Sequence, residues 1–126
     1  MEIGPAFIHR SRAYLKGDYL PKIRKAVGAL AREDLWWRPN EASNSVGNLL
    51  LHLAGNVRQW VVSGIGGTPD HRRRDHEFAA RDGATPAELL QALDEAVEDA
   101  DRVLADLDPG ELLDKRVIQG MDVSVL

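Results

Sequence analysis

Apolar residues recur at intervals of three or four in three long segments, and this spacing is the strongest constraint on the fold. Side chains at that spacing share one face of an α-helix, so each segment predicts an amphipathic helix with one apolar stripe. The segments cover residues 5–31, 46–63 and 86–107. Helices of this kind must bury their stripes against one another. The sequence therefore predicts an all-α bundle, with residues 1–126 as a single domain.

Local signals indicate where these helices begin. Pro21 interrupts the first segment. We expect it to kink one long helix, because the apolar stripe continues beyond it, although Asp18 could instead cap a second helix. Residues 43–45 offer several N-caps for the second helix. Thr85, with Glu88 three residues later, forms a capping box, so we expect the third helix to begin directly after Thr85.

Two segments have no helical periodicity. Residues 66–83 form a loop that is long for a compact domain, and a crossover between helices that are not antiparallel neighbours would explain its length. In the tail, residues 116–126 could form short extended pieces, or Asp122 or Ser124 could cap a new helix. We interpret the tail as the point where a fourth helix is missing or only begun, in a domain that is incomplete at its C-terminus.

Composition excludes several classes of protein. The chain has no cysteine, which excludes disulfides, thiolate zinc sites and iron–sulfur clusters, so a metal would need His, Asp or Glu. The lack of cysteine also fits a cytoplasmic protein. No apolar run approaches the roughly 20 residues of a membrane span, so we expect no membrane association. Phosphate loops, dinucleotide-binding glycine motifs, serine-hydrolase elbows and zinc-protease motifs are absent from the sequence.

Charge is distributed unevenly along the chain. Residues 1–83 carry 13 Lys and Arg against 9 Asp and Glu, whereas residues 84–126 carry 3 against 11. The acidic end argues against a general polyanion binder, so we expect no nucleic-acid partner. We interpret the acidic residues as a solvated face of the third helix, packed near a basic neighbour.

His52 has the best claim of the four histidines to a functional site. On the second helix it lies about 100° to one side of the apolar stripe. It shares this flank with Ser45, Asn48, Asn56 and Gln59. A polar flank can line a pocket where it faces a neighbouring helix, and it is unremarkable where it faces water. Two interpretations stay open: a ligand or catalytic group, or a boundary histidine with an ordinary hydrogen bond.

The other histidines give weaker signals. His71 and His76 flank the arginines at 72–74, whose positive charge disfavours a bound cation. These arginines could contact an anion or pair with the acidic third helix. We expect His9 to be a partly exposed helix residue, and Trp60 to lie in the core or in a pocket wall.

Residues 35–60, LWWRPNEASNSVGNLLLHLAGNVRQW, resemble the signature segment of the DinB/YfiT-like family. The similarity extends through GIGGTPDHRRRDHEF and TPAELLQALDEAVEDADRVLADLDP. The resemblance implies an up-down four-helix bundle with a long crossover between its second and third helices, and a divalent metal held by three histidines. His52 matches the ligand from the second helix, and Asn48, Asn56 and Trp60 are candidates for lining the pocket. The other two ligands belong to a His-x-x-x-His pair on the fourth helix, which this sequence lacks.

For the full-length protein, the resemblance implies a metal-dependent enzyme of the hydrolase or thiol-transferase type. Zinc, nickel, iron or manganese would lower the pKa of a bound water or thiol. A lone imidazole cannot define such a site, so we expect this chain to bind metal weakly or not at all. The alternative is a non-catalytic helical oligomerisation or interaction protein. Because three stripes without a fourth leave an apolar groove exposed, we also expect a homodimer.

Overall fold

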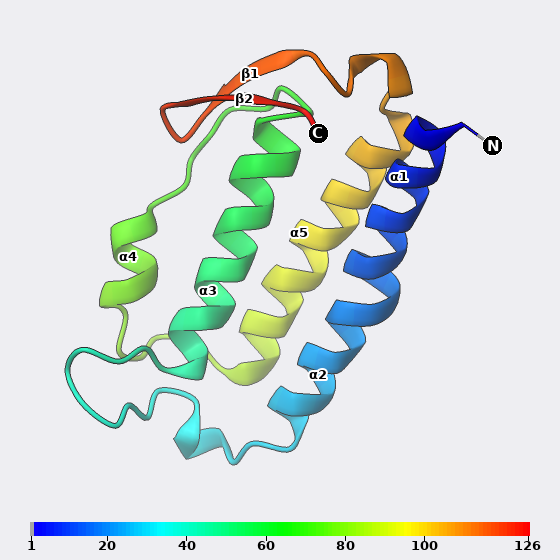
Figure 1. The fold of residues 1–126 in the computed structure, drawn as a ribbon. Helices are drawn as coiled ribbons and strands as arrows, with labels where there is room; N and C mark the ends of the chain where they lie inside the picture. Colours follow the sequence, from blue (N-terminus) through cyan, green and yellow to red (C-terminus); the bar gives the residue numbers. More distant parts are fainter. Residues whose placement is uncertain (1) are drawn as a thin grey trace.

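The computed structural model describes residues 2–126, and most of these residues are helical (Figure 1). Within that range the three predicted segments form three long helices. Their parts are α1 (Ile3–Arg12), a π-helical stretch (Ala13–Tyr19) and α2 (Leu20–Gly28), then α3 (Val46–Val57) with a π-helical end (Arg58–Ser63), and α5 (Pro86–Asp106). The shorter elements are two 3₁₀ turns (Arg32–Asp34 and Pro109–Glu111), α4 (Arg74–Ala79), β1 (Lys115–Ile118) and β2 (Met121–Ser124).

The capping residues act as the sequence predicts. The Ser45 side chain accepts a hydrogen bond from the Asn48 backbone N–H, and Asn48 Oδ1 accepts one from the Ser45 backbone N–H, which completes a capping box. The Thr85 hydroxyl accepts from the Glu88 backbone N–H at the start of α5, which forms the N-cap half of the predicted capping box. These contacts satisfy N–H groups that have no partner within their helices, and both helices begin at the predicted residue.

Pro21 does not end the first helix. Its ring nitrogen has no hydrogen to donate to the carbonyl four residues earlier, at Gly17. The chain widens into the π-helical stretch Ala13–Tyr19 before this proline and resumes α-helical geometry at Leu20. The prediction of one long helix through Pro21 is therefore confirmed, and the alternative of a separate helix capped by Asp18 is wrong.

The three long helices pack in one layer with α5 between the other two (Figure 1). The first long helix runs antiparallel to α5, whereas α3 and α5 run parallel. Residues 64–85 therefore return along the length of α3 before α5 can begin, and we call this segment the crossover. It contains the short helix α4, which the sequence did not predict. A helix of six residues is too short to show a periodic apolar stripe.

The tail forms a β-hairpin, so the expectation that a fourth helix begins at Asp122 or Ser124 is wrong. β1 pairs with β2 in antiparallel register, with Ile118 opposite Met121. Gln119 and Gly120 between them have φ angles of 52° and 73°, which gives the two-residue turn whose twist suits a hairpin. The alternative of short extended pieces describes the tail correctly, and the fold is mostly helical rather than purely α.

Two clusters of buried apolar side chains hold the layer together. The larger lies toward the N-terminal ends of α3 and α5, and the smaller lies at the hairpin end of the long helices. Their buried members are Leu20, Val27, Leu35, Leu50, Leu89, Leu93 and Val97 in the first, and Ile8, Leu104 and Leu112 in the second. Because α5 contributes to both clusters, it is the element against which the other helices are positioned.

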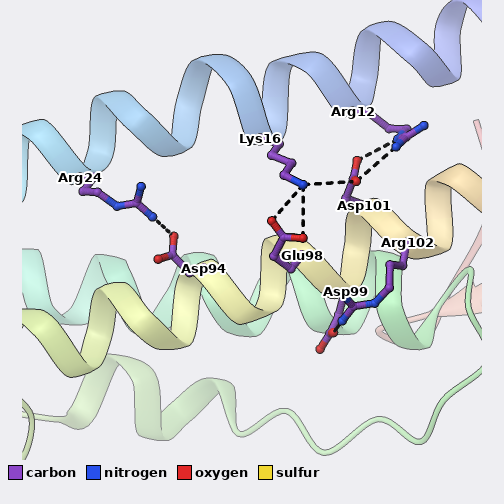
Figure 2. Close-up of polar contacts among 8 residues, drawn as sticks. All are labelled: Arg12, Lys16, Arg24, Asp94, Glu98, Asp99, Asp101 and Arg102. Carbon is purple, nitrogen blue, oxygen red and sulfur yellow. Dashed lines mark hydrogen bonds and ion pairs between the residues drawn. The ribbon is translucent and has the colours of Figure 1, made fainter.

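Ion pairs join the first long helix to α5 (Figure 2). Arg12 Nε donates to Asp101 Oδ1 at 2.8 Å, and Lys16 Nζ lies 3.0 Å from Glu98 Oε1. Arg24 of α2 pairs with Asp94, which lies nearer the N-terminus of α5. The Arg12 hydrogen bond lowers the pKa of Asp101. The acidic face of the third long helix therefore packs beside a basic neighbour, as the uneven charge of the sequence indicated.

An apolar groove lies between the first long helix and α3. Leu93 and Val97 of α5 form its floor, and the groove has a volume of about 240 Å³. Its other lining residues are Leu15, Tyr19, Leu20, Ile23, Leu53 and Val57. Tyr19 and Leu53 are exposed to solvent. Three amphipathic helices thus leave part of their apolar surface uncovered, which is the expectation from the sequence.

Asn48 anchors the crossover to α3. Its side chain is fully buried, and Nδ2 donates to the backbone carbonyls of Glu77 at 2.9 Å and Ala80 at 2.8 Å. Its Oδ1 accepts from Ser45 at the helix cap. One amide therefore completes the N-terminus of α3 and holds the end of α4, which leaves no polar atom of this buried side chain without a partner.

A buried ion pair forms the second anchor. The Arg72 side chain is only 2% exposed, and its guanidinium donates to both carboxylate oxygens of Glu77, at 3.1 and 3.0 Å. A further nitrogen donates to Gln59 Oε1 at 2.8 Å. Gly55 of α3 allows this pair to approach the helix, because a Cβ at Gly55 would lie 1.9 Å from Glu77 Oε2. The crossover can lie this close to α3 only where the helix has no side chain.

We expect Gly55→Ala to lower the free energy of unfolding by about 1–3 kcal/mol, because the added methyl must displace the buried Glu77 carboxylate. Urea unfolding followed by circular dichroism measures the change. Gly17→Ala is the matched control, since no atom of another part of the chain lies within 4 Å of a Cβ at that helical glycine. The control should gain about 0.5–1 kcal/mol from better helix propensity. A similar gain for Gly55→Ala would contradict the described packing.

Candidate functional site

A large cavity lies between α3, α5 and the crossover. It has a volume of about 770 Å³, which is in the range of small-molecule sites. The residues that line it are Leu51, Gly55, Arg58, Gln59, Val62, Ser63, Thr68, Pro69, Asp70, His71, Arg72, Arg73, His76, Glu77, Asp99, Arg102, Val103 and Asp106. The cavity exists because the crossover arches from the end of α3 while Arg72 and Asn48 hold its far part against the helix.

Arg58 and Arg102 share one carboxylate at the α5 side of this cavity. Arg58 Nη1 donates to Asp99 Oδ2 at 2.8 Å, and Arg102 donates to the other oxygen, Oδ1 (Figure 2 shows Asp99 and Arg102). The Arg58 hydrogen bond lowers the pKa of Asp99, so this carboxylate stays ionised at neutral pH. Asp99 thereby holds two guanidinium groups beside one another with one negative charge between them.

Asp70 fixes the opposite wall of the cavity. Its carboxylate accepts hydrogen bonds from Gln59 Nε2 at 2.8 Å and from the Arg72 backbone N–H at 2.9 Å. The Gln59 hydrogen bond, followed by that from Arg72, lowers the pKa of Asp70. Gln59 therefore connects the end of α3 to the crossover through both ends of its amide, since its Oε1 accepts from the Arg72 guanidinium.

His52 lies behind Arg72 rather than in the cavity wall. Arg72 Nη2 lies 3.1 Å from His52 Nδ1, and Glu77 Oε1 lies 3.4 Å from the same nitrogen. A guanidinium can only donate, so in this arrangement Nδ1 is the acceptor and the hydrogen of a neutral imidazole is on Nε2. The ring also packs against Phe78, with centroids 5.0 Å apart. His52 thus makes a side-chain hydrogen bond within the chain, as expected for a histidine at the boundary of the apolar stripe.

The described residues do not fit a catalytic metal site. Across residues 2–126, no three His, Asp or Glu side chains are grouped so that they could hold an ion. The imidazole of His52 faces the positively charged Arg72, which opposes a cation on Nδ1. His71 and His76 line the large cavity instead and lie on the crossover. Within residues 2–126, the side chains grouped around His52 therefore offer a metal fewer than three ligands.

The three residues predicted to line a pocket do not line the large cavity. Asn48 caps α3 and holds the crossover. Trp60 Nε1 donates to Gln119 Oε1 in the hairpin turn at 3.3 Å, so this indole contacts the tail. Asn56 is partly buried on α3 and is not among the residues around this cavity. The cavity opens on the neighbouring face of the same helix.

Sequence reasoning placed Gln59 on a flank that could line a pocket and singled out the basic loop from His71 to His76, but it missed the other α3 residues that form the cavity wall. Leu51, Gly55, Arg58 and Val62 recur at helical spacing, and the glycine among them indicates a close approach by another segment. That pattern could have identified the correct face of the helix. The contribution of Asp99 could not have been found in this way, because pairing it with Arg58 depends on the packing of α3 against α5.

None of the helices within residues 2–126 combines the length and the hydropathy needed to cross a membrane.

Comparison with known proteins identifies a family for this chain. The family described as mycothiol-S-transferase matches residues 12–125. No curated protein and no solved structure matches the chain. The matched range includes all three long helices except the start of the first, together with the crossover and the hairpin. It agrees with the resemblance to DinB/YfiT-like proteins. The chain belongs to the mycothiol-S-transferase family, which is a DinB-like family.

Proposed function

We propose that this chain is a thiol transferase that joins the sulfur of a small thiol to an electrophilic carbon of a second substrate. The family match over residues 12–125 is the observation that carries this proposal. The family description names mycothiol, and mycothiol is the thiol that we propose as co-substrate. The cavity of about 770 Å³ between α3, α5 and the crossover supports the proposal, because it offers room for a small molecule beside charged groups.

The transfer begins with loss of the thiol proton, because the thiolate is the nucleophile. The sulfur lone pair then forms the carbon–sulfur bond, while the leaving group departs with its bonding electrons and the proton is released. We propose that Arg73 stabilises the thiolate, since a neighbouring positive charge lowers the pKa of a thiol. His71 or His76, at the same wall, would accept the proton.

The cavity gives the first test. We expect the protein to form a thioether from mycothiol and 1-chloro-2,4-dinitrobenzene faster than buffer does, as measured by mass spectrometry of the product. Asp106→Trp should reduce this rate at least tenfold, because an indole at the cavity wall would occupy substrate volume. Glu95→Trp, at an exposed position of α5 outside the cavity, is the control and should retain the rate.

Equal rates for the two variants would remove the cavity from the proposal. No thioether from the folded wild-type protein would overturn the transferase function and favour the alternative, a helical interaction protein without catalysis.

Metal dependence is a separate proposal. We propose His52 as the residue that this chain contributes to a divalent metal site of the DinB type. The described residues do not supply the remaining ligands, so no step of the transfer is derived through a metal.

For this proposal we expect less than one equivalent of zinc to remain on the wild-type protein after dialysis, and less again on His52→Ala, by elemental analysis. His9→Ala, a histidine away from this site, should retain the wild-type amount. Equal zinc on the wild type and His52→Ala would exclude His52 as a ligand.

We also propose that two copies associate through the apolar groove. The groove has an apolar floor and rim, and a twofold-related copy would present the same surface in return. Tyr19 and Leu53 are exposed at its edges and would become buried.

Light scattering at micromolar concentration should therefore give the mass of a dimer. Leu53→Glu should shift the mass to that of a monomer, because a carboxylate in an apolar interface has no partner. Leu113→Glu replaces an equally apolar side chain that is 75% exposed outside the groove, and it should leave the dimer intact. A monomeric wild-type protein would contradict the proposal.

A further inference from the structure

The carboxylates around the large cavity are almost all engaged. Asp70 accepts from Gln59 and from the Arg72 backbone. Both oxygens of Glu77 accept from Arg72, and both oxygens of Asp99 accept from arginines. Among the described lining residues, Asp106 is the one carboxylate without a hydrogen bond to the protein. The cavity therefore has few acceptors left for a ligand's donors.

The donors around the same cavity are mostly unused. Arg58 and Arg102 each use one nitrogen on Asp99, although a guanidinium carries five N–H groups. Side chains of Arg73, His71 and His76 make no hydrogen bond to the described part of the chain. The Arg58 and Arg102 side chains are 43% and 66% exposed, so a ligand in the cavity can reach them. Unused donors thus outnumber unused acceptors, which favours an anion.

Asp99 gives these donors a fixed arrangement. It binds Arg58 through one oxygen and Arg102 through the other, so one carboxylate links the two guanidiniums at the cavity wall. Because the pKa of Asp99 is lowered, this bridge persists through the neutral range. Two positive charges against one negative charge leave the cluster with a net positive charge. A planar guanidinium recognises a carboxylate through paired N–H groups, which a point charge cannot do.

Apolar side chains complete the cavity. Leu51 and Val62 line it from α3 and its π-helical end, Val103 from α5, and Pro69 from the crossover. These side chains have no polar group that could bind a small inorganic ion. They can pack against the hydrocarbon part of an organic molecule. The arrangement therefore combines an apolar wall with a cationic pair.

We propose that this cavity binds a small organic carboxylate, with its carboxylate on Arg58 and Arg102 and its hydrocarbon part against Leu51, Val62 and Val103. The ligand's place as the acceptor substrate rests on the proposed transferase function. The binding itself does not, since it requires no thiol and no turnover.

Isothermal titration calorimetry with 4-phenylbutyrate tests the proposal, with 4-phenylbutyramide as the neutral isostere. We expect the acid to bind and the amide to bind at least tenfold more weakly, because only the acid can form charge-assisted hydrogen bonds with the two guanidiniums. Arg102→Met and Arg58→Met should each weaken binding of the acid about tenfold and leave the amide unchanged. Inorganic phosphate should bind more weakly than the acid, because it cannot use the apolar wall.

Arg24→Met is the matched control. Arg24 also pairs with a carboxylate of α5, but it lies outside the cavity, so this variant should bind the acid as the wild type does. Thermal unfolding of every variant establishes that the fold is retained. Equal binding of acid and amide, an equal loss in Arg24→Met, phosphate binding as tight as that of the acid, or no binding of the acid would each overturn the inference. Acid binding without any thioether formation would overturn the transferase function alone.

Discussion

The parallel arrangement of α3 and α5 is the constraint on which the rest of the structure depends. Both helices present their stripes to a shared core and run in the same direction. The chain must therefore return along the length of α3 and its π-helical end, about 27 Å, before α5 can begin. Residues 64–85 are more than long enough for this distance, and the surplus forms α4 and an arch. The cavity is the space under that arch. Parallel packing therefore creates the candidate site, and the anchoring of the crossover gives it a fixed shape.

The crossover is anchored by polar contacts rather than by apolar burial. A buried ion pair such as Arg72–Glu77 must recover a large desolvation cost, and hydrogen bonds at nearly every remaining position recover it here. Such a pair contributes more to the choice of one arrangement than to net stability, because a shifted crossover would leave a buried charge without its partner. Gly55 adds a steric condition to the electrostatic one, since a side chain at that position would occupy the place of the Glu77 carboxylate.

The sequence predicted the features that depend on contacts between residues close together in the chain, and it missed those that depend on distant residues. The starts of α3 and α5 depend on contacts across three residues, from Ser45 to Asn48 and from Thr85 to Glu88, and both were predicted correctly. The cavity depends on contacts across many more residues, such as Arg58 with Asp99, which periodicity cannot register. The tail lies between these cases. Its turn is local, but the same short run of polar and β-branched residues also fits a helix start, so the sequence alone favoured the wrong alternative.

His52 shows how the crossover controls the chemistry available to α3. Metal binding through Nε2 requires that nitrogen to have a lone pair, and the ring hydrogen must then be on Nδ1. Glu77 Oε1, at 3.4 Å, could accept that hydrogen, whereas Arg72 at 3.1 Å favours the opposite tautomer because it can only donate. The two members of one ion pair thus make opposite demands on the same nitrogen. The position of Arg72 decides between them, and Arg72 is fixed by the crossover rather than by the helix that carries His52.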